Sequence, residues 1–441
     1  MTVYEVIDIL FEESSFSEAL LLLLTVLLVY FIVFRRRFSS VFDPLVYVLA
    51  LSSVAQTMLL LMVLHELASI TKLSFVAACL GLFYAGFLFV DTSKPRAQSG
   101  NPLQARAPLL RQVAGGTLAV LFFVELFVLA TTYTFFGVPL FLESRLSQFV
   151  DSGGFGVLNR LQTGLEFSSL VLAFVALRQR TSAAGWAWAI LIQFLISGLL
   201  SGSKGSLLSL LFAWYLARVY LVGGWHPISK LPKSMIILLA LLGTSPLLVI
   251  WIQNREAASS LGATLQLLAL RIAAEGDPYA YFLGGDAIDA IARHDWLAPL
   301  RPVLVALRLG SPESSVNPGF EIVREILGVD APAAGPNSRL AIYLLYFYGF
   351  GGIVLAPLLG MTLGLARNFV GRRVRGSPMS FAVAAAVYLH FCKLEVDPQL
   401  TIAGLFGLGL VLPIFWLARF AGGVRLKPPV PRRVQLAGPE C

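Results

Sequence analysis

Long apolar segments separated by short polar ones run through almost the whole chain. A helix needs roughly 20 apolar residues to cross the hydrocarbon of a bilayer. Eleven segments approach or exceed that length: about 18–34, 43–64, 73–90, 113–136, 161–177, 183–200, 206–222, 234–252, 339–366, 379–392 and 399–418. None alternates apolar and polar residues as a barrel strand does. The pattern therefore predicts an all-α polytopic membrane protein with about 11 transmembrane helices.

The composition supports this fold class. Of the 441 residues, 57% are hydrophobic and only 13% are charged, whereas a soluble domain carries about 25% charged residues. The three cysteines provide no disulfide framework, and neither they nor the four histidines have metal-ligand spacing. We therefore expect no metal and no cofactor.

The basic residues predict the orientation. Acidic residues precede the first span and Arg35, Arg36 and Arg37 follow it, so this segment does not resemble a cleavable signal peptide. With the N-terminus outside, the inner loops and the basic, proline-rich tail 419–441 hold 21 of the 33 lysines and arginines, counting Arg218. Because basic residues collect on the cytoplasmic side, we expect N-out and C-in. The net charge of +8 indicates contact with anionic membrane lipid and not with nucleic acid.

A single long polar segment, 253–338, interrupts the membrane domain 1–441 between the eighth and ninth spans. From Gln253 to Arg339 it holds seven arginines, ten carboxylates and no lysine. The guanidinium group can grip a carboxylate or phosphate through two parallel hydrogen bonds, which lysine cannot do. The composition therefore predicts chemistry on the outer side of the membrane.

Helical periodicity continues inside this segment, which predicts a small helical cap. Leu261, Leu265, Leu268 and Ile272 recur at helical spacing up to Gly276, and a second short helix is expected after Asp286. Asn317-Pro318 and Gly328 are start and stop signals for a third helix, Phe320 to Leu327.

Four candidate residues of the cap lie close together in sequence: Arg271, Glu275, Asp277 and Tyr279. Arg271 and Glu275 could also form a plain i,i+4 ion pair on an exposed helix. Glu275 and Asp277 are too close in sequence to form a glycosidase pair, because side chains two residues apart diverge. Tyr279 and Tyr281 could stack on sugar rings or belong to an interfacial aromatic belt.

Two further basic residues lie where apolar spans begin or turn. Arg339 opens the ninth span after Asn337, a good helix cap, at the end of the helix whose dipole favours an anion. Lys204 lies in the turn Ser201 to Gly205, SGSKG, which lacks the spacing of a P-loop. Either side chain could instead extend to the head-group region without a function.

Glu125 and Glu166 lie within or near the ends of apolar spans. Intramembrane carboxylates are costly and indicate function by default. Both could instead pair with an arginine of the cap or with polar side chains of a neighbouring helix.

Several of these features together resemble the O-antigen polymerase family, the Wzy-type oligosaccharide repeat-unit polymerases of bacterial inner membranes. They are the Asp43-Pro44 entry to the second span, the SGSKG turn, the long outer loop, and the run PNSRLAIYLLYFYGFGGIVLAPLLGMTLG at 336–364. The related O-antigen ligases carry a histidine-asparagine pair before the ninth span, where this chain has Pro336-Asn337. The resemblance therefore favours a polymerase over a ligase.

The resemblance implies a multi-pass inner-membrane protein with a GT-C-like fold that builds the O-antigen of lipopolysaccharide or a similar surface polysaccharide. Its substrates would be oligosaccharides linked to undecaprenyl pyrophosphate, as donor and as acceptor, and a chain-length regulator protein would be a partner. Essential periplasmic arginines are a theme of the family, and the matching positions here are Arg271, Arg339, Arg255 and Arg324.

On this interpretation the arginines stabilise the leaving diphosphate, while Glu275 or Asp277 deprotonates the accepting hydroxyl. Lys204, Arg255, Tyr279, Tyr281 and Arg324 are expected to contact substrate. The alternatives are an O-antigen ligase that transfers glycan to lipid A core, a flippase for lipid-linked oligosaccharide, and a non-catalytic scaffold. A transporter usually keeps its site at mid-membrane, between matching halves, which this sequence lacks.

Overall fold

The computed structural model describes most of the chain: residues 16–91, 112–141, 156–179, 182–201, 207–225, 247, 250–252, 260–284, 287–297, 299–311, 317–328 and 336–422. Within these ranges every regular element is a helix. Most of the expected span 234–252 and most of the tail 419–441 lie outside the described residues.

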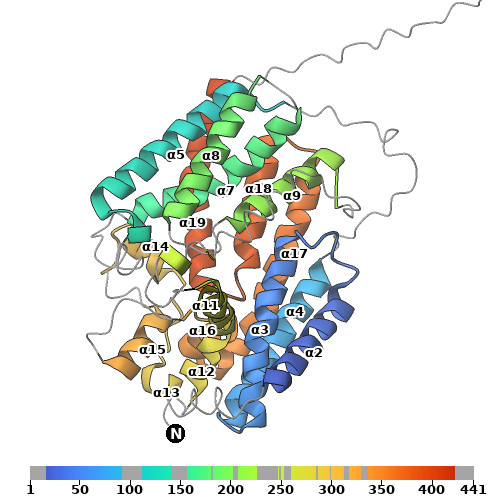
Figure 1. The fold of residues 1–441 in the computed structure, drawn as a ribbon, viewed down its shortest axis with the longest axis vertical. Helices are drawn as coiled ribbons and strands as arrows, with labels where there is room; N and C mark the ends of the chain where they lie inside the picture. Colours follow the sequence, from blue (N-terminus) through green and yellow to red (C-terminus); the bar gives the residue numbers. More distant parts are fainter. Residues whose placement is uncertain are drawn as a thin grey trace, which may run out of the picture.

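Helices lie at the positions of ten of the expected spans (Figure 1). They are α2 (Phe16–Phe34), α3 (Pro44–Leu64), α4 (Ile70–Val90), α5 (Gly115–Phe136), α7 (Gly156–Gln179), α8 (Ala184–Leu200), α9 (Leu208–Val222), α16 (Leu340–Tyr348), α17 (Leu355–Arg373), α18 (Pro378–Cys392) and α19 (Pro398–Gly422), with a 3-10 turn, η1 (Pro139–Phe141), after α5.

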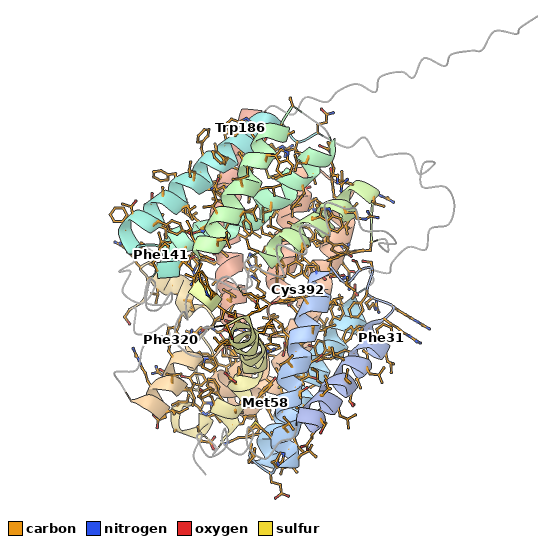
Figure 2. The ribbon with its side chains drawn as sticks, viewed as in Figure 1. Phe31, Met58, Phe141, Trp186, Phe320 and Cys392 are labelled. Atoms are coloured by element: carbon orange, nitrogen blue, oxygen red, sulfur yellow. The ribbon has the colours of Figure 1, made fainter. Side chains whose placement is uncertain are left out.

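Seven helical segments in the described ranges are long and apolar enough to cross a membrane, and α8, α9 and α18 are shorter apolar helices. Apolar side chains also cover the outside of the bundle. Leu21, Leu28 and Phe31 on α2 are 67%, 57% and 59% exposed, and Figure 2 shows Phe31 at the periphery. Exposed apolar surface marks a contact with membrane or protein, and the length of these apolar helices favours the membrane. The chain is therefore an all-helical, multi-pass membrane protein, whereas the total of about 11 spans stays a prediction.

Polar contacts join helix ends that the sequence predicts to lie on the same side of the membrane. Three contacts join residues predicted at inner ends: Arg37 with Asp91, Tyr220 with Gly376, and Gln179 with Val113. Two join residues predicted at outer ends: Glu18 with His65, and Lys72 with Asp289. The helix ends thus separate onto two faces, and which face meets the cytoplasm is still a prediction.

The expected ninth span, 339–366, is not one continuous helix. A 3-10 segment, η5 (Gly349–Val354), separates α16 from α17, and Gly349 has a positive φ of 58°. The carbonyls of Tyr346 and Phe347 accept hydrogen bonds from the amides of Arg293 and Asp295 at 3.0 and 2.9 Å. The break is stable because the cap supplies partners that the helix no longer provides.

The cap contains the three expected helices: α11 (Leu261–Ala273), α13 (Ile288–Ile291) and α15 (Pro318–Leu327). The Asn317 side chain caps α15 by accepting a hydrogen bond from Gly319 N at 2.9 Å, as predicted. The sequence did not predict the 3-10 turn η2 (Ala274–Gly276) or the helices α12 (Asp277–Leu283) and α14 (Arg301–Ala306). Figure 1 shows α11, α12, α13 and α15 gathered around α16 in the lower part of the view.

Two glycines allow α4 and α17 to pack closely. A Cβ at Gly360 would lie 1.8 Å from Phe83 O, and one at Gly86 would lie 2.1 Å from Pro357 O. Small residues at such seams let membrane helices approach to backbone contact.

We predict that Gly360→Ala lowers the stability of the purified protein by about 1–3 kcal/mol, because the methyl group must push α4 and α17 apart. Thermal unfolding in detergent measures the effect. Gly81→Ala on α4 is the matched control, since no atom lies within 4 Å of the place that its new methyl group would occupy. Equal melting temperatures for both variants would contradict the importance of this close packing.

We also predict the orientation of the two faces. In a background without native cysteines, Ser260→Cys at the start of α11 should react with a membrane-impermeant maleimide in intact spheroplasts. Arg372→Cys at the end of α17 should react only after lysis. Both positions are exposed. The reverse labelling pattern would show that the predicted orientation is wrong and that the N-terminus is cytoplasmic.

Candidate functional site

The most deeply buried charge on the cap side of the bundle is Arg339, whose side chain is 0% exposed. It stands immediately before α16, and the helix start is held by a hydrogen bond of 2.9 Å from Leu340 N to Glu395 O. The expected cap by Asn337 is wrong: Arg339 itself occupies the N-cap position, and no side chain caps this helix. The turn that follows α18 thus helps to hold Arg339 in the interior of the bundle.

Arg339 lies between two carboxylates, each from a different part of the chain. Its Nη2 donates to Glu275 Oε2 at 3.0 Å and to Glu275 O at 2.9 Å. Its Nη1 donates to Glu395 Oε2 at 3.1 Å, and Ser52 of α3 donates to the same oxygen. We call these four residues, Arg339, Glu275, Glu395 and Ser52, the Arg339 centre. It ties the cap to α3, α16 and the turn after α18.

The two carboxylates differ in access. Glu395 is 1% exposed, whereas the side chain of Glu275 is 27% exposed. A buried charge is tolerated only when it is paired and hydrogen-bonded, so Arg339 is committed to holding both carboxylates. Glu275 is therefore the member of the centre that a substrate can reach.

Tyrosines surround the centre. Tyr279 of α12 is fully buried, and burial followed by the nearby Glu395 carboxylate raises the pKa of its phenol well above the usual value. Tyr279 Oη, Tyr84 Oη and Glu395 Oε1 have no hydrogen-bond partner among the described residues. Buried polar atoms of this kind are uncommon, so the centre keeps unused hydrogen-bonding capacity beside Glu275.

The other predicted site residues are more scattered. Asp277 and Tyr281 are half-buried on α12, and Arg324 is exposed on α15. Tyr279 is enclosed by protein and presents no open ring to a sugar. The side chain of Arg271, and all of Arg255 and Lys204, lie outside the described residues. Of the predicted residues, the structure therefore brings Glu275 and Arg339 into direct contact.

Besides the contact between Glu275 and Arg339, three further ion pairs among the described residues hold the cap in place. Lys72 of α4 forms an ion pair of 2.6 Å with Asp289 of α13. Arg301 contacts Asp295 and holds the pKa of that carboxyl below its usual range. Arg293 contacts Glu321, which also accepts from the Tyr346 hydroxyl. These pairs position the short helices of the cap over the Arg339 centre.

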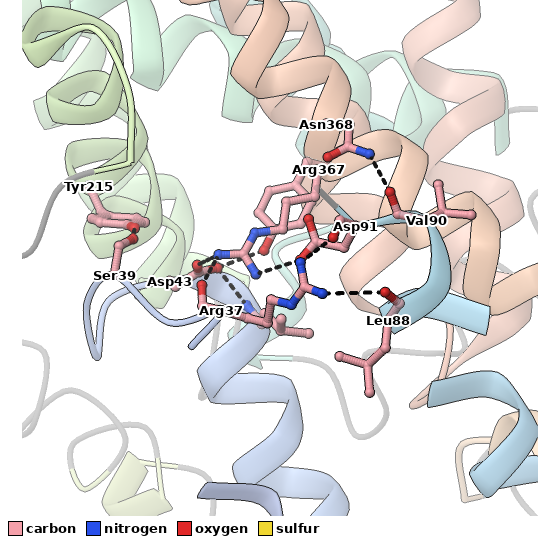
Figure 3. Close-up of polar contacts among 11 residues, drawn as sticks. Arg37, Ser39, Asp43, Leu88, Val90, Asp91, Tyr215, Arg367 and Asn368 are labelled. Atoms are coloured by element: carbon pink, nitrogen blue, oxygen red, sulfur yellow. Dashed lines mark hydrogen bonds and ion pairs between the residues drawn. The ribbon is translucent and has the colours of Figure 1, made fainter. Parts of the chain in front are cut away.

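A second buried arginine lies toward the opposite face of the bundle, and Figure 3 shows its contacts. Arg367 of α17 is 0% exposed; its guanidinium lies 2.7 Å from Asp43 and 3.7 Å from Asp91. Arg37 also contacts Asp91, and Tyr388 donates to Asp43 at 2.6 Å. The Arg367 guanidinium also lies over the Trp225 ring, with its Cζ 4.8 Å from the ring centroid. These carboxylates and aromatic rings enclose the guanidinium, so we assign this centre a structural role.

Sequence reasoning missed Glu395, Ser52 and the burial of Arg367. From the sequence alone, Arg367 could not be distinguished from the other basic residues at the inner ends of helices. The sequence did contain one indication of its burial. Asp43 and Asp91 stand at the ends of two apolar spans, where an acidic residue needs a buried cation. Among the described residues, no group of three His, Cys, Asp or Glu side chains is arranged to hold a metal ion.

Comparison with known proteins adds no assignment: no protein-family model, no curated protein and no solved structure matches the chain. Any function must therefore be inferred from the site itself and from the sequence.

We predict that Arg339→Met lowers stability by roughly 3–5 kcal/mol, because it leaves two carboxylates without their cation. Thermal unfolding of the purified full chain measures this loss. Arg324→Met removes an arginine that is exposed on α15 and should change the melting temperature little. If Arg324→Met lowered the melting temperature and Arg339→Met did not, the buried network would not be what holds the cap.

Proposed function

We propose that the protein is a glycosyltransferase that polymerises oligosaccharide repeat units carried on undecaprenyl pyrophosphate, at the periplasmic face of a bacterial inner membrane. One observation carries the proposal: Glu275 is a partly exposed carboxylate, held by a fully buried arginine 3.0 Å away, where a helical cap meets the membrane bundle. The family resemblance of the sequence supports the same reaction.

The chemistry assigns Glu275 the role of general base. The hydroxyl of the acceptor sugar attacks the anomeric carbon of the donor, and its proton passes to the Glu275 carboxylate. A new C–O glycosidic bond forms, the bond from the anomeric carbon to the diphosphate oxygen breaks, and the lipid diphosphate leaves with the electron pair. No nucleotide is consumed, because the donor is already activated.

The role of Arg339 follows from its burial. Its guanidinium spans Glu275 and Glu395, so it orients the base. Arg339 is therefore a positioning residue. Stabilisation of the leaving diphosphate falls to other arginines of the cap, with Arg271 as the first candidate from sequence.

The test uses the purified full chain in liposomes with lipid-linked repeat units from the native host. The wild type should lengthen the lipid-linked glycan without added nucleotide. Glu275→Gln, which keeps the shape but loses the base, should lower the rate by roughly 100-fold or more. Glu325→Gln on α15, an exposed acidic residue, is the control and should retain full activity. Unchanged activity of Glu275→Gln would reject the assigned base.

Cells carrying Glu275→Gln separate the alternative functions. Loss of a polymerase leaves single repeat units on the surface glycolipid. Loss of a ligase leaves polymer on the undecaprenyl carrier, and loss of a flippase leaves repeat units on the cytoplasmic side of the membrane.

A further inference from the structure

A second polar cluster lies beside the Arg339 centre, on the other face of the turn that joins α18 to α19. It consists of Arg160 and Glu166 on α7 together with Lys393 and Asp397 in the turn. All four side chains are half-buried. We call them the α7 polar cluster. The proposed reaction uses none of them.

The turn itself separates the two sites. The amides of Val396 and Asp397 both donate to Lys393 O, at 3.0 and 2.8 Å, so residues 393–397 form a helical turn. Side chains four residues apart share one face of such a turn, and the residue midway points to the other. Glu395 accordingly contacts Arg339, whereas Lys393 and Asp397 lie in electrostatic range of Glu166 and Arg160 respectively.

The α7 side of the cluster is a polar stripe. Asn159, Gln162 and Glu166 recur at helical spacing and stay half-buried, while Leu165 and Phe167 beside them are buried. Gln162 Nε2 donates to Glu166 Oε1 at 2.7 Å. A carboxylate facing lipid would be expensive, so a polar setting is needed for the part of Glu166 that protein does not cover. The stripe therefore forms the α7 side of the cluster, toward Lys393 of the turn.

A fifth residue extends the α7 polar cluster. Glu125 of α5 is 6% exposed, its Oε1 has no hydrogen-bond partner among the described residues, and it lies in electrostatic range of Glu166. With Glu125 the cluster holds three carboxyl groups and two basic side chains. This balance does not favour an anionic ligand such as a diphosphate.

The hydrogen-bonding groups are mixed and in part unused. Within the described ranges, neither the Arg160 guanidinium nor the Lys393 ammonium has a hydrogen bond or a close ion pair. Donors on these two residues therefore lie in electrostatic range of acceptors on Glu166 and Asp397. A hydroxyl group both donates and accepts, so several hydroxyls on one rigid ring match such a set better than a phosphate, which only accepts.

We propose that the α7 polar cluster binds an uncharged, hydroxyl-rich ligand, namely the saccharide portion of a glycan whose reacting end lies at Glu275. The assignment of that saccharide as a substrate rests on the proposed function. The turn 393–397 then serves both sites, since it anchors the general base through Glu395 on one face and presents sugar-binding groups on the other.

The test measures binding apart from catalysis. The probe is the repeat-unit oligosaccharide of the native host, released from its lipid diphosphate by mild acid and labelled with a fluorophore. The full-length wild type should bind it, and inorganic pyrophosphate should not compete. Lys393→Met and Glu166→Met should each weaken binding by roughly tenfold or more, the loss expected for one hydrogen bond to a charged group.

Two further variants control for folding and charge. Lys393→Arg retains the donors and should bind within about threefold of the wild type, since it can make hydrogen bonds of similar strength. Arg372→Met removes an exposed charge at the end of α17, on the other face of the bundle, and should bind like the wild type. Competition by pyrophosphate on the wild type would overturn the inference without any variant, and so would unchanged binding by both methionine variants.

The outcome is distinguishable from failure of the proposed function. Saccharide binding that depends on Lys393 and Glu166, in a protein that does not polymerise lipid-linked units, would uphold the binding site and reject the polymerase. In a protein that does polymerise, both methionine variants should raise KM with little change in kcat, because they weaken binding and leave Glu275 in place.

Discussion

The cost of burying a guanidinium group in an apolar bundle governs the arrangement of the described helices. Arg339 and Arg367 are both fully buried, and each must be enclosed by carboxylates to be tolerated at all. The carboxylates come from distant parts of the sequence: Glu275 and Glu395 for Arg339, Asp43 and Asp91 for Arg367. Each arginine therefore fixes the relative positions of several elements.

The two centres share a frame. Asp43 caps the start of α3 and Ser52 lies about two and a half turns further along the same helix, so α3 contributes to both. The segment α16 to α17 carries both arginines, and α18 leads from Tyr388 at one centre to Glu395 at the other. Packing between lipid-exposed helices offers little hydrophobic driving force. Directional ion pairs at both ends supply the specificity that apolar contact does not.

Hydrophobic length was enough to predict the membrane helices, and cap signals were enough for α15, because both depend on local sequence. The break at Gly349 was not predictable in this way, because the carbonyls just before it accept from amides far earlier in the chain, in the cap. Glu275 and Arg339 could be selected separately from sequence, but their contact depends on the fold. Glu395 carried no local signal, since a single acidic residue beside Lys393 and Asp397 looks like an ordinary polar turn.

The backbone hydrogen bonds from Arg293 and Asp295 into the broken helix have a mechanical consequence. If the cap lifts away from the bundle, the carbonyls of Tyr346 and Phe347 lose their donors in an apolar setting, at a cost of about 1–3 kcal/mol for each. The 3-10 segment is then no longer the preferred backbone path. Cap position and the backbone path of this membrane segment are thus coupled, so that any ligand that displaced the cap would also change the shape of a helix inside the bilayer.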